Sequence, residues 1–257
     1  PIVLMVAGVV DEESGAASTL GLHYLLENQI ITTKSATATL PQPSVTGAIY
    51  VEPNHNITIG HRGLVRLTIT VKGEAVHTGS SKWCGNMRGQ NANMALCEIL
   101  CKIEEYQWPL DLHDSFPNLK LTITPGTLFN GGSFESVVPD TAEAYIDVRT
   151  MTDTNPQFVI DTVEKITADV ITKRNSNHKV TSGAQLKAQV FVKNKLPSSF
   201  IAKHHPLALA CIDGLKQVYG NDYPINVGGC GPANEGYMLS KASIPCICGF
   251  GPKGENM

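Results

Sequence analysis

The sequence predicts an α/β protein in which two parts of one α/β domain flank an inserted βαββαβ unit. Three observations lead to this fold class. Residues 2–52 run from an apolar segment through an amphipathic one to a second apolar one, the pattern of a βαβ unit with parallel strands. Within residues 63–192 the first expected strand alternates polar and apolar positions, which indicates a sheet with one exposed face. After residue 195 the first pattern returns.

The individual elements follow from hydrophobic periodicity and from turn residues. The first part is expected to contain a strand at 2–10, a helix at about 20–28 and a strand at 48–52. The insertion is expected to contain strands at 64–71, 119–124, 138–149 and 179–192, with helices at 86–104 and 156–172. The last part is expected to contain a helix at 206–219, a glycine-rich turn at 228–231, a short helix at 234–240 and a strand at 244–250. The expected domain boundaries are therefore 1–61, 62–194 and 195–257.

The composition of the chain excludes some classes of function. The 257 residues are 42% hydrophobic, enough for a real core, and the net charge of −3 comes without the basic stripe of a nucleic-acid binder. The opening apolar run is too short to span a bilayer and lacks a basic leader and a cleavage site, so we expect no membrane segment. Seven cysteines without zinc-type spacing, and no export signal, favour the cytoplasm. Pro1 and the unfinished loop before Met257 suggest a chain cut at both ends.

Two groups of carboxylates follow expected strands. Asp11, Glu12 and Glu13 come directly after the first strand, and Glu52 ends the next, where Pro53 stops pairing. Sites in open α/β sheets form outside the carboxyl ends of the strands, so these acids are expected to converge. Their charges would repel without a cation between them, and oxygen donors suit zinc, manganese, cobalt or magnesium. The alternatives are a helix cap at 11–14 and an exposed strand end at Glu52.

Three further sites are weaker when each is taken alone. His77 lies in a Gly/Ser loop, where a lone histidine is more often simply exposed. Arg149 ends a strand and could grip a carboxylate, although a salt bridge to Asp147 or Asp140 is the simpler alternative. The Gly228–Gly231 turn precedes a short helix and could present backbone N–H groups to an anion.

Taken together and in order, these segments resemble the co-catalytic metallopeptidase and amidohydrolase family that includes carboxypeptidase G, aminoacylase, acetylornithine deacetylase and succinyl-diaminopimelate desuccinylase. The resemblance covers nearly the whole chain and rests on five segments: VVDEESG at 9–15, VEP at 51–53, GHRGLVRLTITVKGEAVHTG at 60–79, GGSFESVVPDTAEAYIDVR at 131–149 and IPCICGFGP at 244–252. It implies an incomplete zinc-peptidase-like α/β catalytic domain interrupted by a ferredoxin-like lid and dimerisation domain.

The resemblance also implies residue roles for amide hydrolysis. Glu12 would be the general base, while Glu13 and Glu52 would each ligate one of two divalent metal ions, zinc in the first place with cobalt or manganese as alternatives. His77 would reach into the partner subunit's site of a homodimer and steady the oxyanion. Arg149 would hold the carboxylate of a small N-acyl amino acid or peptide.

Two other substrate-binding positions follow from the same resemblance, and both depart from the usual pattern. Ser136 stands where the family often has Asn, and the segment around Gly229 has Cys230–Asn234 in place of a Thr-Asp or Ser-Asp element.

The resemblance further implies that several metal ligands lie outside this chain. An early His-x-Asp strand and a bridging Asp would precede Pro1, and a closing His would follow Met257. Zinc sites normally use three or more protein donors, so we expect the chain alone to bind metal poorly and to be inactive. The alternative function is a non-catalytic relative that uses the insertion as a dimerisation or binding module.

Overall fold

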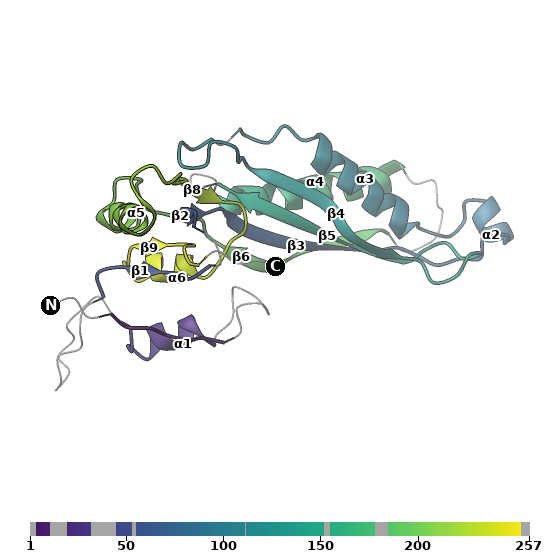
Figure 1. Ribbon diagram of the computed structural model, residues 1–257. Coiled ribbons are helices and arrows are strands. Elements are labelled where there is room, and N and C mark those ends of the chain that lie inside the picture. Colours follow the sequence, from purple (N-terminus) through teal and green to yellow (C-terminus); the bar gives the residue numbers. More distant parts are fainter. Residues whose placement is uncertain are drawn as a thin grey trace. The chain divides into compact units, whose positions relative to one another are not determined.

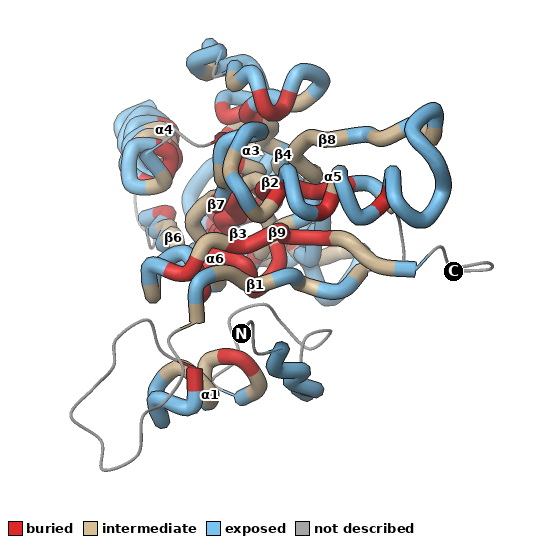
Figure 2. The backbone as a smooth tube through the Cα atoms, turned by 60° about the vertical axis from the view of Figure 1, so that its left-hand side comes forward, coloured by how far each residue is buried: buried red, intermediate tan, exposed pale blue. Residues whose placement is uncertain are grey.

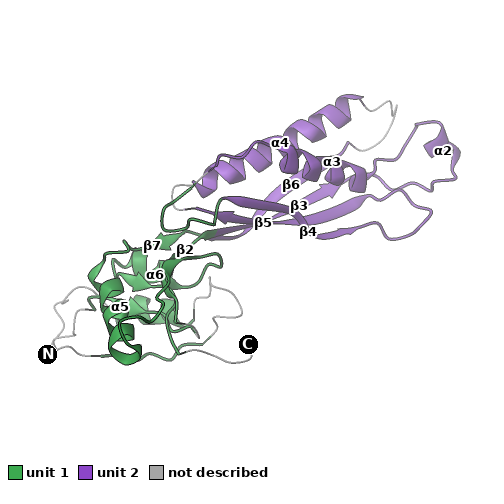
Figure 3. Ribbon diagram, turned by 45° about the horizontal axis from the view of Figure 1, so that its top comes forward, with its two compact units in different colours: residues 1–63, 111–120, 196–257 green, residues 64–110, 121–195 purple. Residues whose placement is uncertain are grey.

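The computed structural model describes residues 4–10, 20–31, 45–52, 55–110, 112–151, 155–177 and 185–252 (Figure 1). The chain folds into two compact units, shown in different colours in Figure 3. Unit 1 contains Pro1–Gly63, Asp111–Lys120 and Leu196–Met257, and unit 2 contains Leu64–Leu110 and Leu121–Lys195. The predicted fold class, an α/β domain interrupted by a βαββαβ insertion, is confirmed.

Unit 2 is a four-stranded sheet with its two long helices on one face (Figure 1). In chain order its elements are β3 (Gly63–Lys72), α2 (Ser81–Cys84), α3 (Ala92–Glu105), β4 (Thr122–Gly131), β5 (Thr141–Thr150), α4 (Pro156–Asn177) and β6 (Lys187–Leu196). The strand order is β4-β5-β3-β6, which is the ferredoxin-like arrangement.

The core of unit 2 follows from strict alternation along its strands. In β5 the side chains of Ala142, Ala144, Ile146 and Val148 are buried, while the positions between them are partly exposed. They pack against α3, whose buried residues lie on one helical face and include Leu96. The helix begins where the Asn91 side chain accepts a hydrogen bond from the N–H of Met94 at 3.1 Å.

The described residues of unit 1 form two small sheets. The elements are α1 (Leu22–Glu27), β1 (Ala48–Ile49), β2 (Ile57–His61), β7 (Ser199–Phe200), α5 (Pro206–Tyr219), β8 (Val227–Cys230), α6 (Gly236–Lys241) and β9 (Cys246–Ile247). One sheet has the order β7-β2-β8, and the other pairs β1 with β9 in parallel. Every residue of β2 and β9 is buried, as Figure 2 shows, and Ile57 and Ile59 of β2 pack against α5.

Residues 112–120 differ from the sequence-based expectation. Their position in the chain places them within the predicted insertion, yet they pack in unit 1. The Phe116 ring is 1% exposed, the carbonyl of Ser115 accepts the N–H of Gly229 at 2.7 Å, and Arg62 Nη1 donates to the carbonyl of Lys120 at 2.9 Å. Local periodicity contains no information about such a return of the chain.

The strand predicted at 2–10 is wrong for the residues described, 4–10, which have no regular structure and are exposed, Leu4 by 86% and Val6 by 87%. A strand needs a neighbour that satisfies its backbone groups, and among the described residues none pairs with this run. The predicted glycine-rich turn at 228–231 is instead mostly strand β8. No described helix combines the length and the apolar character needed to cross a membrane.

Candidate functional site

Glu52 lies just after β1 in unit 1 and is half-buried. Its N–H donates to the carbonyl of Phe250 at 3.4 Å, and its side chain lies against Gly249, where an added Cβ would be 3.2 Å from the Glu52 Cγ. The Cys230 thiol lies nearby. The pKa of Cys230 is raised to about 11, mainly by burial and then by the nearby Cys248 and by the charge of Glu52. The carboxylate of Glu52 therefore faces a protonated thiol at the end of β8.

The other two predicted carboxylates, Glu12 and Glu13, lie outside the described residues. Their convergence with Glu52 stays a prediction.

A metal centre is not complete in the part of the chain that the structure describes. Among these residues, no group of three or more His, Cys, Asp or Glu side chains could hold a metal ion. The pKa of Cys248 is also raised, by its contact with the Cys246 thiol and by burial, so this thiol stays protonated and is a poor ligand. The described residues therefore do not by themselves fit the metal site that the resemblance implies.

His77 and Ser136 are brought together in unit 2. A β-bridge joins His77 to Val137, and the carbonyl of Ser136 accepts the Thr78 N–H at 2.9 Å and the Thr78 hydroxyl at 3.3 Å. The sequence suggested each residue separately, and the structure shows that they belong to one pair of adjoining loops.

The hydrogen bonding of His77 indicates which ring nitrogen carries the proton. The side chain is exposed, and its Nδ1 accepts the N–H of Gly79 at 3.1 Å. The neutral ring therefore has its proton on Nε2, an assignment that follows from this bond. As a result, His77 has an N–H donor available for a ligand.

Arg149 is engaged in the salt bridge that was its simpler alternative. Its Nε donates to Asp147 Oδ1 at 2.7 Å and its Nη2 to Oδ2 at 3.3 Å. Arg66 Nε donates to the same Oδ2 at 3.3 Å. Two guanidinium groups thus share one carboxylate, so these three groups together carry one net positive charge.

Gly229 permits a close approach inside unit 1. A Cβ at this position would lie 1.9 Å from Cε1 of Phe116, so no larger residue fits without a shift of the ring. Its N–H is already donated to the carbonyl of Ser115. The protein's own backbone therefore occupies the group that the sequence suggested for an anion.

Of the buried polar side chains that were not singled out from the sequence, a glutamate and a histidine can carry a charge. Glu235 is 0% exposed and precedes α6, and its charge, after burial, helps to raise the pKa of Tyr237. His61 is also 0% exposed, and its Nδ1 donates to the carbonyl of Arg62 at 2.9 Å. Both lie in short segments near glycines, where hydrophobic periodicity gives no signal.

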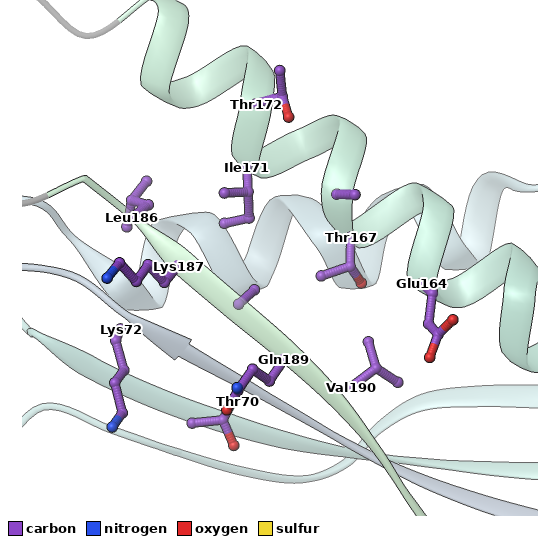
Figure 4. A pocket seen from close by; sticks show the side chains of 12 residues that line it. Thr70, Lys72, Glu164, Thr167, Ile171, Thr172, Leu186, Lys187, Gln189 and Val190 are labelled. Atoms are coloured by element: carbon purple, nitrogen blue, oxygen red, sulfur yellow. The ribbon is translucent and has the colours of Figure 1, made fainter.

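Two cavities lie away from the residues suggested by the sequence. One of about 750 Å³ lies in unit 2 between α4 and β6, lined among others by Thr167, Lys187 and Gln189 (Figure 4). Another of about 550 Å³ lies in unit 1 beside α5 and is largely apolar, with His55 and Tyr219 in its wall.

Comparison with known proteins finds a family match in the middle of the chain. Residues 59–175 match the M20 model described as a peptidase dimerisation domain, a range that contains most of unit 2. This part of the chain is thus similar to the dimerisation domain of the M20 peptidases, which confirms the resemblance that the sequence segments indicated.

The curated proteins that match the chain share modest sequence identity with it. Probable carboxypeptidases of Paracoccidioides lutzii and Paracoccidioides brasiliensis are each 30% identical over 167 residues, which cover 63% of this chain and 34% of theirs. The chain spans about a third of the length of these curated relatives.

Solved structures show the same fold at low identity. A tripeptidase from Staphylococcus aureus has a TM-score of 0.59 at 13% identity. The superposition covers 91% of this chain and 60% of the tripeptidase chain. Human carnosine dipeptidase 1 has a TM-score of 0.58 at 16% identity, with coverage of 90% and 56%. The aminobenzoyl-glutamate utilization protein of Klebsiella pneumoniae has a TM-score of 0.58 at 13% identity, with coverage of 94% and 56%.

Proposed function

We propose that the whole protein is a metal-dependent hydrolase that cleaves an amide bond, in a peptide or an N-acyl amino acid, next to a free carboxylate. The observation that supports this function most directly is the peptidase dimerisation domain at residues 59–175. The names of the relatives, a probable carboxypeptidase, a tripeptidase and a dipeptidase, point to short peptides or to cleavage at a chain end. Deacylase activity on N-acyl amino acids involves the same bond type.

In this proposal Glu12 is the general base. It accepts a proton from the attacking water and later donates it to the leaving amine. His77 contributes the Nε2 proton as a donor to the oxyanion that develops on the scissile carbonyl. Two divalent ions, zinc or else cobalt or manganese, are the proposed cofactors. Glu13 and Glu52 would supply one ligand each, an assignment that rests on the family resemblance.

Arg149 is the proposed partner of the substrate carboxylate. Its two hydrogen bonds to Asp147 use Nε and Nη2, so the Nη1 group can still donate. The second cation, Arg66, offsets the charge of Asp147 and so keeps the local field positive. This supports a preference for anionic substrates.

The proposed partner is a second copy of this chain, bound through unit 2. Its sheet has two edge strands, β4 and β6. The β6 edge contains Lys187, Lys193 and Lys195, and lysines on an edge discourage pairing with another chain. The β4 edge has no charged residue and, beside α3, exposes apolar side chains: Met94, Leu128 and Phe129. These differences favour the β4 edge as the dimer surface.

A cytoplasmic location belongs to the same proposal. All seven cysteines lie within the described residues and all are free thiols, as expected in a reducing compartment.

The test of the function is an assay of the whole protein, loaded with zinc or cobalt, against N-acetyl amino acids, N-succinyl amino acids and dipeptides. Glu12→Gln should abolish turnover while metal content stays near the wild-type value, whereas Glu13→Gln should lower metal content. Glu27→Gln, which changes an acid with a side chain 65% exposed on α1, is the matched control and should alter neither. If the protein dimerises but takes up no metal and hydrolyses no substrate, the result would instead support the non-catalytic binding module.

A further inference from the structure

The loop that presents His77 is closed at its base by one carboxylate. Glu74 and Gln90 exchange two backbone hydrogen bonds, at 3.0 and 2.9 Å, which define a loop of residues 74–90. The Glu74 Oε1 accepts from Arg88 Nε at 2.7 Å and also from Arg88 Nη2. The other oxygen, Oε2, accepts the N–H of Gly89 at 3.1 Å. Both carboxylate oxygens therefore bind the far end of the loop.

The base of this loop has little room for adjustment. A Cβ on Gly73 would lie 2.1 Å from the carbonyl oxygen of Gln90. Gly89 has a φ of +108°, and a Cβ there would lie 2.5 Å from Cγ1 of Val76. Two positions that require glycine thus flank the Glu74 contacts, and they let the two ends of the loop approach closely.

The side of the loop that contains His77 is fixed on its other edge. The carbonyl of Val76 accepts the N–H of Val138 at 2.9 Å, and the carbonyl of Ser136 accepts the N–H of Thr78. His77 lies between these two bonds and three residues after Glu74. A change at Glu74 therefore reaches His77 through a short and constrained stretch of backbone.

We propose that Glu74 and Arg88 are positioning residues that hold the 74–90 loop in the conformation in which His77 Nδ1 binds Gly79 and Nε2 presents its proton. This inference rests on the proposed function for the role of His77. Ion pairs at the surface usually contribute little, but the Glu74 side chain is only 10% exposed and its contact with Arg88 uses two guanidinium nitrogens. Removal of the carboxylate would remove the hydrogen bonds that it accepts from the Gly89 N–H and from Arg88.

The test combines a spectroscopic readout with kinetics on the whole protein. Glu74→Ala and Glu74→Gln are compared by ¹⁵N NMR of the histidine rings, with His77→Gln used to assign the His77 signals. In the wild type the His77 shifts should show the Nε2–H form as dominant. In Glu74→Ala they should move toward the tautomer mixture of a free imidazole, and Glu74→Gln, which can still accept from Gly89, should fall between the two.

In the hydrolysis assay, kcat for Glu74→Ala should fall roughly tenfold or more, because a small displacement of an oxyanion donor weakens its contact. KM should stay within about twofold, because ground-state binding does not use this donor. Glu98→Ala removes the ion pair of Glu98 with Arg174 in the same unit and is the matched control, expected to leave kcat and the His77 spectrum unchanged.

Unchanged His77 tautomers in folded Glu74→Ala would overturn the positioning role, whatever the activity. If Glu74→Ala does not fold, Glu74→Gln and Arg88→Lys provide the same comparison. A wild type that hydrolyses no substrate, but whose His77 signals move in Glu74→Ala, would refute the proposed function and leave the positioning role supported.

Discussion

Gly229 shows how one residue allows two distant segments to pack. Its register partner in β2 is Gly60, and the ring of Phe116 lies where side chains on this face of the sheet would otherwise be. The sequence suggested that the turn containing Gly229 presents backbone N–H groups to a ligand. The structural reason is a contact with a residue more than a hundred positions earlier, which no local pattern contains.

Gly229→Ala should lower the free energy of unfolding by about 1–3 kcal/mol, because the new methyl group must displace the buried Phe116 ring. Urea denaturation measures the effect. The control is Gly214→Ala in α5, where an added Cβ meets no atom within 4 Å and should stabilise the helix by roughly 0.5–1 kcal/mol. Equal effects of the two substitutions would show that Phe116 does not restrict this position.

His61 should make stability depend on pH. Burial lowers the pKa of His61, against the smaller opposite effect of its bond to the Arg62 carbonyl. Between its folded pKa and its unfolded value near 6.5, the unfolded state binds more protons, so the free energy of unfolding falls as the pH falls. The slope contributed by one such group approaches about 1.4 kcal/mol per pH unit.

His61→Asn, whose side-chain amide can still donate to Arg62, should flatten this slope between pH 7.5 and pH 5 in urea titrations. The exposed His204, changed in the same way, should leave the slope unaltered. A wild-type slope that persists in His61→Asn would assign the pH dependence to other groups.

At the level of secondary structure, elements with strong local signals were predicted well. Helix α5 occupies 206–219 as expected, because Pro206 opens it and Gly220, with φ +95°, ends it. Strand β2 was missed because Gly60 and His61 interrupt its apolar pattern, although tertiary packing buries all of it. The run at 4–10 shows the reverse case, since it has an apolar pattern but no pairing partner among the described residues.

The unequal edges of the unit 2 sheet lead to a prediction for assembly. Phe129→Lys places a charge on the proposed β4 surface and should shift the protein from dimer to monomer in size-exclusion chromatography with light scattering. Phe191→Lys makes the same change on the β6 edge, which already has lysines, and should leave the dimer intact. Dissociation by Phe191→Lys alone would assign the interface to the opposite edge.

For the whole molecule, the fold class and the resemblance to this family were predictable because five separate segments occur in a fixed order. The roles of the candidate site residues stay predictions, and the structure shows only how some of these residues lie. The segments that contain His77 and Ser136 adjoin, and Arg149 forms an ion pair with Asp147. Glu12 and Glu13 lie outside the described residues, so their distance from Glu52 stays a prediction. The contacts of Glu74 could not be predicted, because they depend on how a loop of seventeen residues, 74–90, closes.

If His77 acts across a dimer, two inactive variants should complement each other. A one-to-one mixture of His77→Ala and Glu12→Gln, after subunit exchange, should recover about a quarter of the wild-type rate, because half of the dimers are mixed and each has one intact site. Each variant alone should stay inactive. No recovery despite demonstrated exchange would indicate that each subunit uses its own His77.

The return of residues 112–120 to unit 1 has a practical consequence for anyone who wants to study the dimerisation domain as an autonomous module (Figure 3). The chain passes between the units four times, so a single cut at each end of 64–195 does not excise unit 2 cleanly. Such an excision would carry Phe116 away from its glycine neighbour and expose an aromatic ring to water. A short polar linker in place of 111–120 should therefore yield a more soluble isolated domain.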